Sequence, residues 1–384
     1  MANEFIVPGR IITGSRSLKE LNNCIDDIGK KALIVCDQIA VRLGKVKIIG
    51  DILSSKKIKF AIFDNFLEEP TDLMVEEAFS IYKKEKCDFF IGIGGGSALD
   101  IMKAVAVMDA IGGKLSDQRG KEISGINAKM IAIPTTAGTG SEASQYAIIT
   151  DTASGVKALF KGKELMPDIV IIDPDLTETL SPKMTASTGI SALAHAIEAY
   201  TSQKAQPLTD TLALSAIKRI YNYLPLAYRD SGNDVARREL SIAALEAGMA
   251  FNNSSATLVH AMTCAIGARF HVPYGIANAM ILSGCLEYAK EGARSRFAEM
   301  ARVIGAAIDN DSEDRAAEFF LLEIKKICDI CHMPTFKGYG ISREAFFAQI
   351  DKMTKDAMES GCASNTRREV DEEVLKDLYR KIYA

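Results

Sequence analysis

The sequence lacks several features that would point to a membrane, to secretion or to nucleic acid. None of its 384 residues belongs to an apolar run approaching the ~20 residues that cross a bilayer. The first residues, MANEFIVPGR, have neither the basic start nor the apolar core of a signal peptide. Lys and Arg number 46 against 50 Asp and Glu, and they form no basic cluster that would attract nucleic acid. We therefore expect a soluble protein whose partners include neither a membrane nor a nucleic acid.

Cysteine and histidine are both scarce, with 8 and 4 in the chain. Cysteines at irregular spacing in so long a chain are typical of reduced thiols in a cytoplasmic protein. The segment CDICH, residues 328–332, matches the attachment pattern of haem c. Its surroundings, LLEIKKICDICHMP, have helical spacing and end at a proline that stops a helix. We interpret this segment as the end of a helix with small buried thiols.

Short apolar runs alternate with helical patterns in the first half of the chain. Five runs are predicted to be strands, namely KALIVCD (31–37), IKFAIFD (58–64), CDFFIGIGGGS (87–97), AKMIAIPTT (128–136) and PDIVIIDP (167–174). Helices are predicted between them at 17–28, 73–85 and 98–110. Continuous runs of Val, Ile and Phe separated by helices favour a parallel sheet that is covered on both faces.

The pattern changes near residue 180. Ser181 and Pro182 have the residue types of a helix N-cap and of the first helical position. Beyond them apolar residues recur three and four apart, and no strand is predicted after about residue 175. We therefore predict an α/β nucleotide-binding domain with a parallel sheet over residues 1–180 and an all-α domain over residues 181–384.

A glycine-rich turn, GIGGGSALD at 92–100, leaves a predicted strand and enters a predicted helix. Glycines let the backbone approach a phosphate, and the amides of a helix N-terminus bind its charge. The turn departs from the usual dinucleotide fingerprint, because Ser97 stands at its third position and because it follows the third predicted strand. Taken alone, it fits a phosphate site or a tight structural turn equally well.

Two further features favour a dinucleotide. The loop PTTAGTGSEAS, 134–144, follows a predicted strand and is rich in hydroxyls suited to phosphate and ribose oxygens. Asp37 ends the first predicted strand, where a carboxylate accepts hydrogen bonds from ribose hydroxyls and repels a 2′-phosphate. The alternatives are a surface loop and a strand-end turn residue. Together with the glycine turn, these features predict a dinucleotide site that prefers NAD(H) to NADP(H).

Several long motifs occur in the order and spacing of a known family. The resemblance is to the iron-containing (group III) alcohol dehydrogenases, and it is carried by GGGSALD, PTTAGTGSEAS, PDIVIIDPDL, TGISALAHAIEAYTS and LVHAMTCAIGARFHVPYGIANAMIL. It implies the fold of that family, shared with dehydroquinate synthase: an N-terminal nucleotide-binding domain, a helical C-terminal domain and an active site in the cleft between them. We also expect a homodimer or a higher homo-oligomer.

The resemblance assigns cofactor contacts to both loops. It implies a pyrophosphate loop formed by Gly94, Gly95, Gly96, Ser97 and Asp100. It implies further cofactor contacts from Thr135, Thr136, Thr139 and Lys157. Asp37 matches the position at which an acid favours NAD over NADP in the family.

The metal site of the family is incomplete in this sequence. The family holds a divalent ion with an aspartate and a histidine four residues apart on one helix and with two later histidines. His195 and His260 match two of these ligands, but Ser191 stands at the aspartate position and Tyr274 at the last histidine position. A serine hydroxyl is a poor ligand, so Fe²⁺ or Zn²⁺ is expected to bind weakly or not at all. The alternative ligands are Cys264, which replaces a further family histidine, His271 and a Tyr274 phenolate.

We expect an NAD-dependent alcohol dehydrogenase or aldehyde reductase that moves hydride between NAD(H) and a small alcohol or carbonyl compound. Without a metal, His260, Tyr274 or His195 would stabilise the alkoxide by hydrogen bonding, and an activated carbonyl would be the favoured substrate. A second hypothesis is a nucleotide-binding pseudoenzyme or assembly subunit of the same fold. A third, a dehydroquinate synthase-like lyase or cyclase, is disfavoured because Arg269 is the only Lys or Arg in 188–200 and 252–280.

Overall fold

The computed structural model describes residues 2–66, 69–153 and 155–383, and it divides the chain into two compact units. The first unit spans residues 6–179. The second begins at Leu180 and also includes residues 2–5, where Gln206 Nε2 donates a hydrogen bond to the Glu4 carbonyl oxygen at 2.9 Å. The first unit therefore differs from the predicted domain of residues 1–180 at both ends, because the first residues and Leu180 group with the helices.

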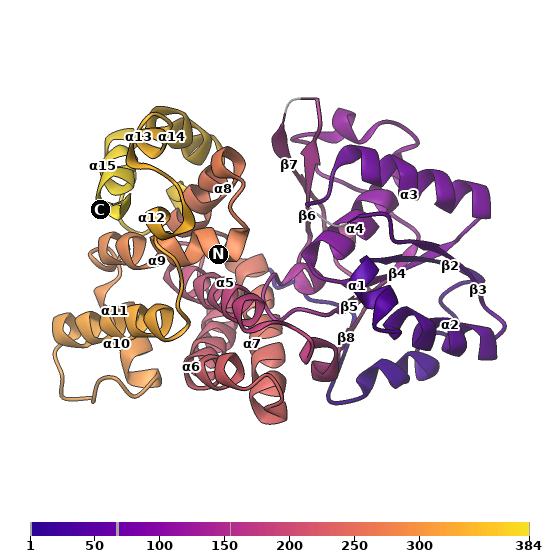
Figure 1. Ribbon diagram of the computed structural model, residues 1–384, viewed down its shortest axis with the longest axis horizontal. Helices are drawn as coiled ribbons and strands as arrows, with labels where there is room; N and C mark the ends of the chain where they lie inside the picture. The colour runs from indigo at the N-terminus through magenta and orange to yellow at the C-terminus, as the bar shows by residue number, and fades with distance from the viewer. Residues whose placement is uncertain (1, 67–68, 154, 384) are drawn as a thin grey trace. The chain divides into compact units, whose positions relative to one another are not determined.

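Within the described residues, the first unit contains a 6-stranded parallel sheet (Figure 1). The strands lie in the order β1 (Arg10–Thr13), β8 (Ile169–Ile172), β5 (Lys129–Pro134), β4 (Phe89–Gly94), β2 (Lys31–Cys36) and β3 (Lys59–Phe63). The predicted parallel sheet is thus confirmed, and each predicted strand corresponds to one of these elements. Strand β1 was not predicted, because its four residues are only partly buried and form no apolar run.

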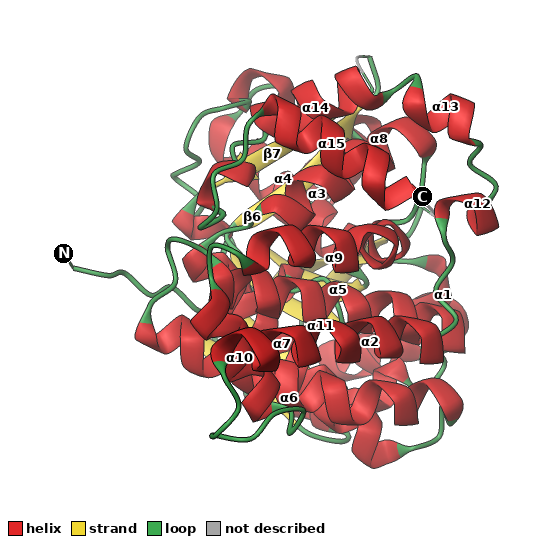
Figure 2. Cartoon of the chain, turned by 90° about the vertical axis from the view of Figure 1, so that its left-hand side faces the viewer, coloured by secondary structure: helices red, strands yellow, loops and turns green. Residues whose placement is uncertain are grey.

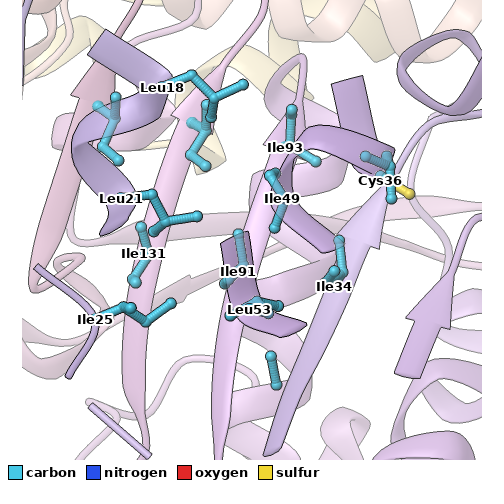
Figure 3. Close-up of a cluster of buried hydrophobic side chains, with 14 of the residues drawn as sticks. Leu18, Leu21, Ile25, Ile34, Cys36, Ile49, Leu53, Ile91, Ile93 and Ile131 are labelled. Carbon is cyan, nitrogen blue, oxygen red and sulfur yellow. The ribbon is translucent and has the colours of Figure 1, made fainter. Parts of the chain in front are cut away.

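Helices cover both faces of this sheet. On one face, α2 (Lys45–Ser55) and the 3-10 helix η1 (Ser17–Asn23) pack on the strands, and Figure 3 shows their side chains against those of β2, β4 and β5. The other face is covered by α3 (Asp72–Glu85) and α4 (Gly96–Ile111). The helix predicted at 17–28 corresponds to η1, which is a 3-10 helix and ends earlier, at Asn23.

The strand order reverses between β2 and β4. The chain leaves β2 for β3 on one side and then returns to β4 on the other side of β2. In open parallel sheets, ligands bind at the carboxyl ends of the strands where the order reverses in this way. Asp37 follows β2 and the glycine turn follows β4, so both predicted cofactor elements lie at this reversal.

A two-stranded antiparallel hairpin, β6 (Tyr146–Asp151) and β7 (Val156–Lys161), follows β5. Sequence reasoning did not predict it, because polar residues interrupt both strands. Alternate residues are buried in each strand, as expected of a sheet with one face against a core. Lys157 therefore belongs to a strand of this hairpin.

The second unit is helical (Figure 2). Its helices are α5 (Pro182–Thr201), α6 (Pro207–Arg229), α7 (Asp234–Ser254), α8 (Leu258–Phe270), α9 (Tyr274–Lys290), α10 (Arg294–Val303), α11 (Glu313–Ile330), α12 (Phe336–Tyr339), α13 (Arg343–Phe347), α14 (Ile350–Glu359) and α15 (Glu372–Tyr383). Ser181 caps α5 by accepting a hydrogen bond from Met184 N at 3.2 Å, and Pro182 is its first residue, as predicted. Among the described residues, no helix combines the length and the apolar character needed to cross a bilayer.

Candidate active site

The glycine turn between β4 and α4 has a backbone that favours glycine. Gly94 has φ +152, and a Cβ at this position would lie 2.7 Å from Ala98 Cβ and 2.9 Å from Asp37 Oδ2. Gly95 is the N-cap of α4, so the first amides of that helix have no helical acceptors. Such amides beside glycines bind anions well. The turn therefore suits the phosphates of a nucleotide.

Asp37 lies beside this turn at the end of β2. Its Oδ1 accepts a hydrogen bond from Ala40 N at 2.7 Å, and this bond caps the short helix α1 (Gln38–Arg42). Its Oδ2 is one of the two atoms that a Cβ at Gly94 would meet most closely. The cap therefore fixes the carboxylate next to the turn, a constraint that sequence reasoning did not find.

The hydroxyl-rich loop after β5 packs against the glycine turn. Thr135 N donates a hydrogen bond to Gly94 O at 2.9 Å, and a Cβ at Gly96 would lie 3.0 Å from Thr139 Cγ2. Thr136 Oγ1 is buried and has no hydrogen-bond partner within the part of the chain that the structure describes. Because buried hydroxyls are normally partnered, this atom fits a bound ligand. The two loops therefore form one surface suited to a dinucleotide.

Two of the predicted cofactor residues have partners within the protein. Asp100 Oδ2 accepts a hydrogen bond from Ile148 N at 3.2 Å, and burial raises the pKa of its carboxyl to about 6. Lys157 Nζ forms an ion pair with Glu69 at 2.7 Å. Contacts of these two side chains with a cofactor stay predictions.

A lysine that sequence reasoning missed holds the hydroxyl-rich loop in place. Lys103 of α4 is fully buried, and its Nζ donates hydrogen bonds to the carbonyl oxygens of Ser141 and Ser144 at 2.6 Å each and of Tyr146 at 3.0 Å. Burial lowers the pKa of this ammonium group to about 8. A signal was present in the sequence, because Lys103 is a lone charge inside the apolar run IMKAVAVM.

Three helices of the second unit bring the predicted catalytic side chains together. His195 comes from α5, His260 from α8, and Tyr274 is the first residue of α9. The Tyr274 hydroxyl oxygen lies 2.6 Å from His260 Nδ1 and 3.4 Å from His195 Nε2. One phenol therefore bridges the two imidazoles.

The backbone of α9 approaches α5 closely at this point. A Cβ on Gly275 would lie 2.2 Å from Ser187 O, so a larger residue at position 275 would force the two helices apart. The Phe251 ring of α7 packs beside both imidazoles, with centroids 4.5 Å from His195 and 5.5 Å from His260. Gly275 and Phe251 thus fix the geometry of the cluster, and sequence reasoning identified neither.

The cluster has a buried side and an accessible side. His195 is 5% exposed, whereas His260, Cys264 and Tyr274 are half-buried. Burial lowers the pKa of His260 and raises the pKa of Tyr274 well above its ordinary value. At pH 7 both groups are therefore neutral, and the contact between them joins a phenol to a neutral imidazole.

The residues at the ligand positions of the family do not fit a tightly held divalent ion. Ser191 Oγ accepts a hydrogen bond from Asn278 Nδ2 at 3.3 Å. His260 Nε2 lies 3.5 Å from Cys264 Sγ, so both ring nitrogens of His260 have protein partners. A serine hydroxyl and a protonated phenol are weak ligands. In the described ranges, no group of three or more His, Cys, Asp or Glu side chains has the arrangement of a metal site.

The alternative ligand His271 and the CDICH segment both lie at helix ends. His271 is the exposed C-cap of α8, with φ +51. Helix α11 ends at Ile330, and Cys331 is its C-cap. Burial raises the pKa of the Cys328 thiol to about 12, and His332 Nδ1 lies 3.1 Å from the Tyr228 hydroxyl. These thiols therefore belong to the packing of a helix end.

Comparison with known proteins relates both units to one family. The model of the iron-containing alcohol dehydrogenases matches residues 8–174, and the model of the C-terminal domain of that family matches residues 185–383. The chain is 33% identical over 371 residues to the NAD-dependent methanol dehydrogenase of Bacillus methanolicus, covering 96% of each chain. It is 30% identical over 391 residues to the NADPH-dependent butanol dehydrogenase of Clostridium saccharobutylicum, covering 99% of this chain and 97% of that one.

The fold is also that of a solved relative. The crystal structure of a 1,3-propanediol oxidoreductase matches this chain with a TM-score of 0.95 at 30% identity, covering 100% of both chains. Dinucleotide-dependent oxidoreductases are among the enzymes that combine a parallel-sheet unit, with a turn suited to nucleotide phosphates, and a helical unit. The chain belongs to the iron-containing alcohol dehydrogenase family and is an alcohol–aldehyde oxidoreductase. The predicted family and fold are confirmed, and the comparisons lend no support to the pseudoenzyme alternative.

Proposed function

We propose that this chain interconverts a small alcohol and its aldehyde or ketone with NAD(H), and that Tyr274 serves in place of a metal ion. The observation that carries this proposal is the Tyr274 hydroxyl, which lies 2.6 Å from His260 Nδ1 and 3.4 Å from His195 Nε2. The relatives named for methanol, butanol and 1,3-propanediol support a small alcohol as the substrate class.

The proton is handled by the residues of this cluster. When bound, NAD(H) supplies or accepts the hydride at the carbon that carries the oxygen. In the direction of reduction, the Tyr274 hydroxyl donates its proton to the carbonyl oxygen, which becomes the alcohol oxygen. His195 and His260 stabilise the resulting phenolate by hydrogen bonding, and a proton from solvent restores the phenol. In the direction of oxidation, the same groups take the hydroxyl proton away. His195 acts through Tyr274, because its own ring is buried.

The proposed coenzyme is NAD(H), with NADP(H) bound less well. Asp37 supports this preference, because its carboxylate is held beside Gly94 by the bond to Ala40 N and would repel a 2′-phosphate. Family membership alone does not decide the coenzyme, since one relative is named as NAD-dependent and another as NADPH-dependent.

The remaining proposals concern the metal, the assembly and the compartment. Fe²⁺ or Zn²⁺ binds weakly or not at all, because the donors at the four ligand positions include no carboxylate and only two imidazoles. We propose a homodimer or a higher homo-oligomer, and we propose the cytoplasm, since the eight cysteines are thiols and not disulfides.

The test is a screen of the purified chain with NADH and with NADPH against short aldehydes and ketones, and with NAD⁺ against the corresponding alcohols. Each assay is run with and without a chelator, and the metal content is measured on the same sample. The expected result is NADH-linked turnover that the chelator leaves unchanged. Turnover that disappears with the chelator would contradict the role of Tyr274, and bound NADH without turnover would support the pseudoenzyme.

A further inference from the structure

The first amides of α8 are held by side chains from other parts of the unit. Helix α8 carries His260 as its third residue. Among the described residues, the side chain of its N-cap, Thr257, accepts no hydrogen bond from the first amides of the helix. The Thr257 hydroxyl instead donates a hydrogen bond to Glu198 Oε1 at 2.6 Å. The same Oε1 accepts hydrogen bonds from Thr257 N at 2.9 Å and from His260 N at 3.1 Å. Helix α5 therefore supplies His195 and, one turn later, the carboxylate that holds the backbone of His260.

A second external cap comes from the loop between α14 and α15. Thr366 Oγ1 accepts a hydrogen bond from Leu258 N at 3.2 Å. Asn365 Nδ2 donates to Ala256 O at 3.0 Å and lies 3.1 Å from Ser255 Oγ. Ser255 has φ +76, a left-handed conformation that is strained for a residue other than glycine. The turn before α8 is therefore held in a conformation that it would not keep by itself.

This loop is in turn fixed to the end of α5. Gln203 N donates a hydrogen bond to Asn365 O, and Gln203 Nε2 donates to Thr366 O, both at 2.8 Å. The end of α5, the start of α8 and the loop at residues 365–366 are consequently joined by direct hydrogen bonds. A shift of any one of them moves the backbone that carries the His260 ring.

Capping α8 with the Glu198 carboxylate lowers the stability of the fold. Its side chain is 1% exposed, and its Oε2 has no hydrogen-bond partner among the residues described here. A buried carboxylate with an unsatisfied oxygen lowers stability, and a hydroxyl could cap α8 at a smaller cost. The carboxylate does offer one oxygen that accepts hydrogen bonds from two amides and a hydroxyl at once, at the positive end of the helix dipole.

We infer that Glu198 and Thr366 are positioning residues, which hold the start of α8 so that His260 Nδ1 meets the Tyr274 hydroxyl. The kinetic part of this inference rests on the proposed function, whereas the structural part does not. A displacement of about 1 Å in a catalytic group lowers rates by as much as about 100-fold, so a small shift of α8 has a measurable effect.

The experiment compares Thr366→Val, which keeps the side-chain shape but loses the acceptor, with Thr366→Ser, which keeps the hydroxyl. Ser312→Ala is the matched control, because Ser312 caps the remote helix α11 through Arg315 N at 3.4 Å. The chain is labelled with ¹⁵N-histidine, and with four histidines the ring signal of His260 is readily assigned. The ring signals, the melting temperature, the KM for NADH and kcat are measured for each variant.

For Thr366→Val we expect a shifted His260 ring signal and a kcat that falls about tenfold, with an unchanged KM for NADH. Thr366→Ser should resemble the wild type. Ser312→Ala should lower the melting temperature by a similar amount and leave kcat and the His260 signal unchanged. Glu198→Gln keeps an acceptor oxygen and should lose less activity than Glu198→Ala, and if Glu198→Ala does not fold, Thr366→Val decides.

A Thr366→Val variant that loses only melting temperature, as Ser312→Ala does, would overturn the inference. If the wild type shows no turnover at all, the proposed function fails, and the His260 signal then decides the positioning role by itself. A shifted signal in Thr366→Val would support that role, and an unshifted one would reject it.

Discussion

The Tyr274 hydroxyl and His260 Nδ1 lie 2.6 Å apart, at the point where the resemblance to the family implies a divalent ion. This contact joins two positions that were both predicted as catalytic, and it occupies one of the two ring nitrogens through which His260 could coordinate a metal. The following measurements distinguish catalysis by hydrogen-bonded side chains from catalysis by a bound metal ion.

Replacing Tyr274 with Phe removes the hydroxyl and keeps the ring. We expect kcat for aldehyde reduction to fall by about 10²- to 10⁴-fold, because the proton donor is lost, while the melting temperature changes little. Steady-state kinetics with NADH and thermal unfolding give both values. Tyr228→Phe is the control, since that hydroxyl pairs with His332 away from the cluster, and an equal loss in both variants would contradict the prediction.

The double variant Ser191→Asp, Tyr274→His restores the ligand set that the family resemblance implies. We expect it to bind Fe²⁺ or Zn²⁺ much more tightly than the wild type, because it offers one carboxylate and three imidazoles around His195 and His260. Elemental analysis and titration with a chelator provide the measurement, with each single variant as a control. A wild type that already carries one tightly held ion per chain would show that Cys264, Tyr274 or water completes its ligand shell.

Replacing Asp37 with Gly should narrow the preference for NADH over NADPH. The variant removes the charge that would face a 2′-phosphate and also removes the cap of α1. Asp37→Ser separates the two effects, since a hydroxyl can still accept the hydrogen bond from Ala40 N. We expect both variants to bind NADPH more tightly, as measured by fluorescence titration. An unchanged ratio of the two dissociation constants would mean that Asp37 serves only as a cap.

Glu142 makes the stability of the first unit depend on pH. It is 2% exposed, and burial raises the pKa of its carboxyl to about 7. The folded chain therefore holds this proton more tightly than the unfolded chain, and the stabilising contribution is present below about pH 4.5 and is lost as the pH rises through about 7.

Glu142→Gln should accordingly gain stability relative to the wild type as the pH rises from 4.5 to 7, by up to about 3 kcal/mol. Chemical denaturation at several pH values measures this difference. Glu76→Gln on the exposed face of α3 is the control and should show no such trend. A constant difference between Glu142→Gln and the wild type across this range would contradict the assigned cause.

The sequence predicted the strands whose consecutive residues are nearly all apolar and buried. The apolar runs that became β2, β4, β5 and β8 are nearly fully buried, so their composition reports their place in the sheet. Strand β1 and the hairpin β6–β7 were missed because they are only partly buried and because polar residues interrupt their apolar residues.

The candidate site was predictable only in part. The family motifs led to His195, His260 and Tyr274, but the distances between their atoms depend on how three helices pack. The hydrogen bonds of Glu198 to α8 and of Thr366 to Leu258 join residues that are remote in sequence. No periodicity or spacing reports such contacts, because each requires the tertiary structure.

The close packing at Gly275 bears on which side chains position 274 can present to the cluster. The close approach of Gly275 to Ser187 O is a property of the backbone, so the residue before it is delivered to the same point whether that residue is an imidazole or a phenol. The contact between the two helices therefore does not depend on which side chain stands at position 274. In the proposed function, the phenol at position 274 is a proton donor at the place where the family resemblance implies a metal ligand, and the close contact of Gly275 with α5 involves neither side chain.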